Sequence, residues 1–161
     1  MVQTTCRSLL ASLIVIGLLG TAARAQQGTS SREAKPEDQI LAVLEHYRTA
    51  METKSLKALG EVMDPQLLIY EGLHKNDSWE DYRDHHIAEH FKEWKEFKIQ
   101  DPKVIELFVS GDLAYAVQMA TNRVVPENGK EKISDSVQTF VFRKGAQGWK
   151  IKHIHSFSKQ R

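Results

Sequence analysis

The hydrophobic pattern in the middle of the chain predicts two helices. Between Pro36 and Glu52 the apolar residues recur about every 3.6 positions, and proline suits a first helical position. The apolar positions are Ile40, Val43, Leu44, Tyr47 and Met51. A second helix is predicted to start after its N-cap, Ser55, and to stop at Asp64-Pro65. We therefore expect a long helix followed by a short one.

A third helix is predicted after a short buried strand at residues 67–70. Asn76-Asp77-Ser78 breaks the chain and offers an N-cap, after which apolar and aromatic residues again recur at helical spacing. This stripe consists of Trp79, Tyr82, His86, Ile87, His90, Phe91 and Trp94. We expect one face of this helix to pack against the rest of the domain.

Beyond residue 100 the hydrophobic period changes from about 3.6 to 2, which is typical of strands. Four strands are predicted, at residues 104–109, 113–125, 133–143 and 149–157, and Asn128-Gly129 is a strong hairpin signal. Helices followed by hairpin-connected strands indicate an α+β fold. We expect a curved, mostly antiparallel sheet, a cone-shaped barrel, wrapped around the long N-terminal helix, with two further helices and a cavity inside.

The first 25 residues have the pattern of a cleavable signal peptide. Arg7 precedes an apolar run, residues 9–19, and Ala23-Arg24-Ala25 fits the small-x-small cleavage pattern. That run is too short to cross a bilayer, which takes about 20 residues. We therefore predict cleavage after residue 25, no stable membrane anchor afterwards, and an exported protein that is periplasmic or secreted. Residues 26–35 are predicted to form a disordered leader and residues 36–161 a single domain.

Charge and cysteine content exclude several classes of function. Residues 1–25 hold two of the 22 basic residues, Arg7 and Arg24, and none of the 21 acidic ones, so the rest carries 20 basic and 21 acidic residues. This balance does not indicate nucleic-acid binding. Cys6 is the only cysteine. The predicted mature domain therefore has no disulfide and no thiol nucleophile, and its stability depends on its apolar core.

Four phrases of the sequence occur in a characteristic order. They are Tyr47-Arg48-Thr49-Ala50-Met51, Leu67-Leu68-Ile69-Tyr70-Glu71-Gly72, Gly111-Asp112-Leu113-Ala114-Tyr115 and Gly148-Trp149-Lys150-Ile151-Lys152-His153-Ile154-His155-Ser156. Together they resemble the SnoaL-like branch of the nuclear transport factor 2-like superfamily. The resemblance covers about residues 37–158. It implies a cone-like α+β barrel, commonly a homodimer packed through the outer face of its sheet. Its pocket would lie between the first helix, the third helix and the inner face of the sheet.

The resemblance leaves the function open, because the family includes ketosteroid isomerases, scytalone dehydratases, polyketide cyclases and domains without assigned chemistry. We expect binding of a small, partly apolar ligand in the cone, without assigned catalysis. One alternative is a proton-transfer enzyme that works without a cofactor, of the cyclase, dehydratase or isomerase type. Another is a dimerisation or interaction domain. We expect no cofactor.

The last strand supplies the first candidate catalytic residues. Strict alternation would put His153 and His155 on the same face as Trp149 and Ile151, which we expect to face inward. Imidazoles titrate near neutral pH and can donate or accept protons. The alternative is that both are structural histidines of the core. Glu71, at about the place of the isomerase carboxylate, is the third candidate, although the second acid of the isomerases has no counterpart on the strand at 113–125.

Five further residues are candidates for ligand contacts. Tyr47 could match the tyrosine of the isomerases, and Tyr70 and Tyr115 are candidate partners of the strand histidines. Trp79 and His86 belong to the aromatic stripe of the third helix. These side chains would line the cone and orient the ligand.

His86-Ile87-Ala88-Glu89-His90 matches the H-x-x-E-H pattern of inverted zinc peptidases. Histidines four residues apart share a helix face, but a third ligand is needed and the domain is much smaller than such peptidases. A non-peptidase metal site that adds His153 or His155 is the alternative. From the sequence alone we assign no metal site. The sequence contains no G-x-S-x-G elbow, phosphate loop or dinucleotide fingerprint.

Overall fold

The computed structural model describes residues 34–161. The predicted signal peptide, residues 1–25, and nearly all of the predicted leader, residues 26–35, lie outside the described residues. Across residues 34–161, no helix combines the length and the hydrophobicity that a membrane span would need.

The first two helices form where their capping residues and apolar spacing predict. Helix α1 is Pro36–Glu52, as expected. Helix α2 is Leu56–Val62, and the Ser55 side chain accepts a hydrogen bond from the Ala58 N–H at its start. Strand β1 begins directly afterwards at Met63, so Asp64 and Pro65 belong to a strand. Both helices pack against the sheet through their apolar faces.

The third helical segment is interrupted by a π-helical turn. It consists of α3 (Trp79–Tyr82), the π-helix η1 (Arg83–Ile87) and α4 (Ala88–Glu93). The Ser78 side chain accepts a hydrogen bond from the Asp81 N–H and caps its start, as the sequence predicts. Trp94 has extended backbone and begins the next strand, so its predicted place on the helix was wrong. Each π turn inserts one residue and shifts the side chains that follow it.

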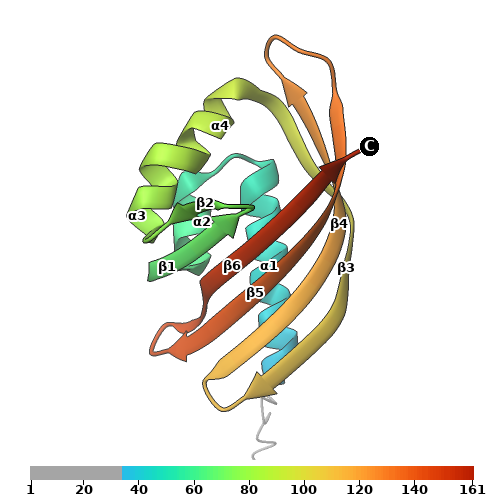
Figure 1. Cartoon of the computed structure of the whole chain (residues 1–161). Helices are drawn as coiled ribbons and strands as arrows, with labels where there is room; N and C mark the ends of the chain where they lie inside the picture. Colours follow the sequence, from blue (N-terminus) through green and yellow to red (C-terminus); the bar gives the residue numbers. More distant parts are fainter. Residues whose placement is uncertain (1–33) are drawn as a thin grey trace, which may run out of the picture. The chain divides into compact units, whose positions relative to one another are not determined.

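A six-stranded mixed sheet forms the second layer (Figure 1). The strands are β1 (Met63–Glu71), β2 (His74–Asn76), β3 (Trp94–Ser110), β4 (Leu113–Pro126), β5 (Lys132–Gly145) and β6 (Gly148–Gln160). Their order is β2-β1-β6-β5-β4-β3, so the sheet is open, with β2 and β3 at its edges. The β1–β6 pair is parallel and the other pairs are antiparallel. The expected α+β fold with a curved, mostly antiparallel sheet is confirmed.

The core lies between α1 and the inner face of the sheet. Figure 1 shows α1 behind β5 and β6, along the concave side of the long strands. The ring of Tyr47 packs edge-on against Phe140, with 5.4 Å between centroids. Phe140, Phe142 and Ile151 are fully buried on the inner face. Toward the β4–β5 hairpin the inner face becomes more polar, with Gln118, Ser136 and Gln138 buried there.

A β-bulge in β6 reverses the predicted orientation of the strand histidines. Phe142 pairs with Ile151 and its neighbour Val141 pairs with His153, so Lys152 is an extra residue in β6. Ile154 therefore lies on the inner face and is 2 % exposed. His153 and His155 lie on the outer face, where His155 is exposed. The prediction that these two histidines face inward was wrong, because one added residue exchanges the faces of a strand.

Candidate active-site cavity

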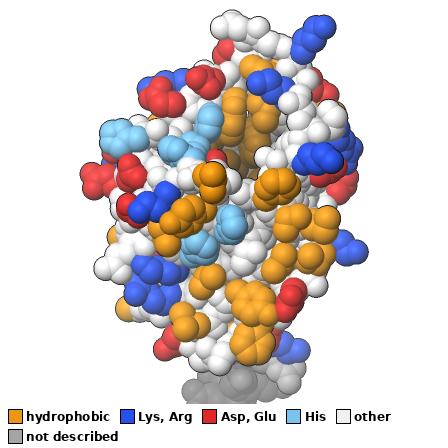
Figure 2. Space-filling model, in the orientation of Figure 1, with side chains coloured by type: hydrophobic (Ala, Val, Ile, Leu, Met, Phe, Trp, Pro, Cys, Tyr) orange, Lys and Arg blue, Asp and Glu red, His pale blue; other side chains and the backbone are white. Residues whose placement is uncertain are grey.

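A cavity of about 420 Å³ opens between the helical layer and the wide end of the sheet. Figure 2 shows a hollow lined by hydrophobic side chains on this side of the molecule. Helices contribute Tyr47, Met51, Tyr82, Ile87 and His90, and β3 contributes Trp94, Phe97 and Ile99. Most of the polar lining comes from Glu71, Asn122, Ser134, Gln138, Ser156 and Ser158. The cavity therefore combines an aromatic and aliphatic wall with a few polar groups, as small-molecule sites do.

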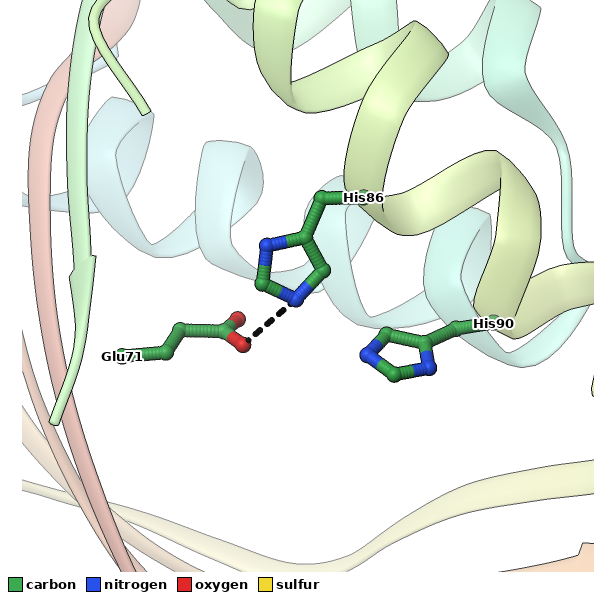
Figure 3. Close-up of side chains that lie close together, drawn as sticks. All are labelled: Glu71, His86 and His90. Atoms are coloured by element: carbon green, nitrogen blue, oxygen red, sulfur yellow. Dashed lines mark ion pairs between the residues drawn. The ribbon is translucent and has the colours of Figure 1, made fainter. Parts of the chain in front are cut away.

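Glu71 and His86 form the charged pair of this cavity. Glu71 ends β1, where its inner-face neighbours Leu67 and Ile69 are buried, so its carboxylate points toward the cavity. His86 Nε2 lies 3.0 Å from Glu71 Oε2 (Figure 3). The Tyr82 hydroxyl donates a hydrogen bond of 3.5 Å to the other carboxylate oxygen, Oε1. The carboxylate thus has a partner at each oxygen.

The buried amide of Asn76 holds the His86 ring in place. Asn76 Nδ2 donates to Asp81 Oδ2 over 3.0 Å, which turns the amide oxygen toward the histidine. His86 Nδ1 lies 3.0 Å from that oxygen and must donate to it, because an amide oxygen only accepts. The other ring nitrogen, Nε2, is then directed at Glu71. Asn76 is 3 % exposed, so water does not replace this contact.

The pair shifts the pKa values of both partners. Burial by itself raises the pKa of Glu71, but the hydrogen bond and charge of His86, helped by the charge of His90, lower it overall. The hydrogen bond to Glu71 raises the pKa of His86, although partial burial opposes this. Each group therefore stabilises the charged form of the other. The arrangement therefore favours a carboxylate next to an imidazolium.

Two tyrosines beside the carboxylate keep their protons. Burial raises the pKa of Tyr47, and the charge of Glu71 raises it further. Burial also raises the pKa of Tyr82 well above its usual range, and Glu71 adds to this effect. Both phenols are therefore hydrogen-bond donors at any physiological pH. The cavity thus combines one anionic acceptor with neutral donors.

The structure separates the predicted site residues into two groups. Tyr47 and Glu71 line the cavity, and His86 supports Glu71 from an adjoining hollow. Tyr70 lies on the outer face, with its ring 6.3 Å from both His153 and His155. The prediction that His153, His155 and Tyr70 converge inside the cone was therefore wrong.

The other two predicted ligand contacts also lie outside the cavity. The Tyr115 hydroxyl donates to Glu106, and its ring packs against Phe108, 5.8 Å away. These residues belong to the outer face of the sheet. Trp79 packs on α2, where its Nε1 lies 3.3 Å from the position a Cβ would take at Gly60. Some members of the aromatic stripe on the third helical segment therefore serve core packing and do not contact the cavity.

Several cavity residues were not identified from the sequence. In the sequence Asn76 carries only the signal of a chain break, and its role depends on the short strand β2, which no sequence pattern predicts. Gln138 and Ser156 lie on the inner face, but single polar residues within strands carry no distinctive signal. Tyr82 and His90 were recognised as members of the helical stripe. The π turn between them decides which of its members reach Glu71.

The profile of the SnoaL-like domain matches residues 40–158. The chain therefore belongs to the SnoaL-like domain family, and its fold is that of the nuclear transport factor 2-like superfamily. No protein with a curated description matches the sequence.

Solved structures share this fold at low sequence identity. A nuclear transport factor 2-like superfamily protein from Salmonella enterica is 16% identical with a TM-score of 0.67, over 75% of this chain and 89% of that one. A conserved protein from Planctomyces limnophilus is 14% identical with a TM-score of 0.71, over 78% and 97%. A hexachlorocyclohexane dehydrochlorinase (LinA) type 2 is 12% identical with a TM-score of 0.67, over 77% and 87%. At such identities the likeness concerns the fold alone.

Proposed function

We propose that the protein binds a small, partly apolar molecule in its cavity and holds the polar group of that molecule at Glu71. The observation that supports this most is the position of one carboxylate at the edge of a 420 Å³ hollow with an apolar wall. Cavities of about 300–1,000 Å³ suit small molecules, and a few polar groups in an apolar lining fix their orientation. A neutral ligand with a hydroxyl or an acidic C–H would match an anionic acceptor.

The binding proposal is tested with 2-naphthol, a neutral bicyclic probe with one hydroxyl donor, by fluorescence titration. Ser156→Phe, which fills the cavity from β6, should abolish binding. Glu71→Gln should weaken it at least several-fold, because a charged acceptor forms the stronger hydrogen bond. Tyr115→Phe, on the outer face, is the matched control and should bind as the unsubstituted protein does. Equal affinity in all three variants would contradict the proposal.

The Glu71–His86 pair favours a second candidate function, proton transfer without a cofactor. A carboxylate in an apolar cavity can remove a proton from a bound molecule. The imidazolium of His86 keeps the Glu71 carboxylate ionised before this proton transfer. His86 cannot turn away, because Asn76 holds its Nδ1 at 3.0 Å. The reaction class would be isomerisation or dehydration. In an isomerisation Glu71 removes a C–H proton and returns it to another carbon of the product; in a dehydration the C–O bond breaks as the C–H proton is removed, and the hydroxyl group takes up a proton and leaves as water.

This second candidate is tested with 5-nitrobenzisoxazole, whose ring opens to a coloured cyanophenol when a base removes its C–H proton. Assays in the presence of a chelator should show turnover above the rate in buffer. Glu71→Gln should remove that turnover, because the amide is not a base. His86→Gln should retain turnover, since the carboxylate remains, and should shift its pH dependence upward, because the pKa of Glu71 rises without the imidazolium. The same rate in Glu71→Gln and in the unsubstituted protein would exclude Glu71 as the base.

We also propose that two copies pack through the outer face of the sheet. Phe157 pairs across the strands with Val137, and Val137 with Met119, which makes an apolar row over β6, β5 and β4. These side chains are 63%, 38% and 46% exposed, and hydrophobic groups gather on this face in Figure 2. Exposed apolar patches commonly mark contact surfaces. Sedimentation should give a dimer that Val137→Asp converts to a monomer, whereas Asp135→Asn should leave it intact.

Export is the remaining element of the proposal, and it is supported by the apolar run and the Ala23-Arg24-Ala25 pattern. Expression of the full chain in a Gram-negative host should place the protein in the periplasm. Mass spectrometry of the N-terminus should find Gln26 as the first residue. Recovery of the intact chain from the cytoplasm would contradict this part of the proposal.

A further inference from the structure

Histidines and glutamates gather in a second hollow beside the cavity. It has a volume of about 390 Å³ and is lined by Glu71, His74, His85, His86, Glu89, His90 and Glu93. Four of the seven histidines of the chain therefore lie in one place. The proton-transfer chemistry proposed above uses only Glu71 and His86. The remaining groups, and His90 in particular, have no part in it.

Glu71, His86 and His90 have the geometry of metal ligands. One ligand atom from each residue lies within 4.8 Å of the other two. Figure 3 shows the three side chains converging, with Glu71 from β1 and both histidines from the helical segment. Zinc bonds of about 2.0–2.2 Å place tetrahedral ligand atoms about 3.3 Å apart. The Glu71–His86 contact of 3.0 Å is already close to that value, so only the half-buried ring of His90 needs to move inward.

His86 has the outer contact that metal-bound histidines use, and His90 has an ion-pair partner in the corresponding position. Each ligand imidazole commonly directs its second nitrogen at a carbonyl or carboxylate, which fixes the ring. His86 directs Nδ1 at the amide oxygen of Asn76, 3.0 Å away. His90 directs Nδ1 at Glu93 Oε2, 3.7 Å away, and its ring is stacked on Trp94 at 4.9 Å. In both residues Nε2 is therefore the nitrogen left for a metal.

We propose that Glu71, His86 and His90 bind a zinc ion at the mouth of the cavity. Two imidazoles and one carboxylate are a ligand set that zinc accepts, and three protein ligands leave a fourth position open. Since Glu71 and His90 also line the cavity, that open position borders the space where a small ligand would bind. The inference goes beyond the proposed function, because zinc binding needs no ligand in the cavity. Glu71 takes the place of His153 or His155, which the sequence offered only as the third ligand of an alternative metal site.

The test uses untagged, chelator-treated protein and titrates Co²⁺, which gives visible absorption bands when bound in a tetrahedral site. One equivalent of Co²⁺ should produce these bands, and Zn²⁺ should abolish them by displacement. Zn²⁺ should also raise the Tm of the protein, because an ion that binds only the folded state stabilises it. Absence of the Co²⁺ bands together with an unchanged Tm would overturn the proposal.

Substitutions separate the proposed ligands from their neighbours. His90→Gln should weaken Zn²⁺ binding by more than the roughly 10–100-fold that loss of an outer partner causes. 2-Naphthol binding is measured on the unsubstituted protein with chelator present and needs no metal, so the metal proposal and the proposed function can fail separately. His85→Ala and Glu89→Gln remove a histidine and a glutamate from the same hollow and should bind Zn²⁺ normally. A loss as large in these controls as in His90→Gln would overturn the assigned ligand set.

Discussion

Replacing Asn76 with alanine tests whether a buried amide holds the Glu71–His86 pair in place. The Asn76 side chain makes two contacts of 3.0 Å, to His86 Nδ1 and to Asp81 Oδ2, and it is 3 % exposed. A hydrogen bond to a charged group contributes about 1.5–3 kcal/mol to the free energy of unfolding. A buried polar group that is left without a hydrogen-bond partner lowers that free energy by about as much. Asp81 keeps a second hydrogen bond, from the Asp77 N–H. The free energy of unfolding should therefore fall by about 2–4 kcal/mol.

Urea unfolding of Asn76→Ala measures this loss, with an unchanged m-value showing that the unfolded state is comparable. Asn122→Ala, which removes the same amide from the lining of the cavity, is the matched control and should change the free energy of unfolding by about 0.5 kcal/mol or less. The Asn76 variant should also bind 2-naphthol more weakly, since the His86 ring is no longer fixed. Equal unfolding free energies for the two variants would refute the role given to Asn76.

Three further predictions concern other parts of the domain. Glu52, whose carboxylate accepts from the Ile99 N–H over 3.1 Å, has a pKa that burial would raise but its hydrogen bonds lower. Its stabilisation is thus present above its unfolded pKa of about 4.3 and is lost as the pH falls through the lower folded value. Glu52→Gln should therefore be less stable by about 1–2 kcal/mol at pH 7, with a smaller deficit near pH 3 in urea unfolding. Gly148 has φ +88°, so Gly148→Ala should lower the Tm by several degrees in calorimetry. His153→Ala and His155→Ala should leave 2-naphthol affinity unchanged. A large loss of affinity in either variant would contradict the placement of these histidines on the outer face.

The helices and hairpins were predictable because their signals are local. Pro36 starts α1, and Ser55 and Ser78 cap the helices that follow them. Asn128-Gly129 lies in the turn between β4 and β5. Strand β2 and the early part of β3 were missed. In β3, charged residues hide the alternation and Asp101, with φ 49°, interrupts the regular strand. Backbone features that depend on pairing with a neighbouring strand leave little trace in a single sequence.

The candidate site was only partly predictable for the same reason. Glu71 and Tyr47 were identified through the resemblance, and the structure places both at the cavity. The inward orientation of His153 followed from strict alternation, which the extra residue at Lys152 breaks. The contact between His86 and Glu71 joins a π turn to the end of β1, and no spacing in the sequence reveals it. Sequence patterns therefore predicted the helices and strands. The register of strand pairing and the π turn decided which side chains come into contact.

The protonation of His86 tests the central claim, that it is paired with Glu71 at the cavity, most directly. Heteronuclear NMR titration of the imidazole nitrogens, with chelator present, measures its pKa in the unsubstituted protein and in Glu71→Gln. The pairing predicts a pKa above the usual value of about 6.5 in the unsubstituted protein and a clear fall in the variant. The same pKa in both proteins would contradict the pairing and, with it, the proposed role of Glu71.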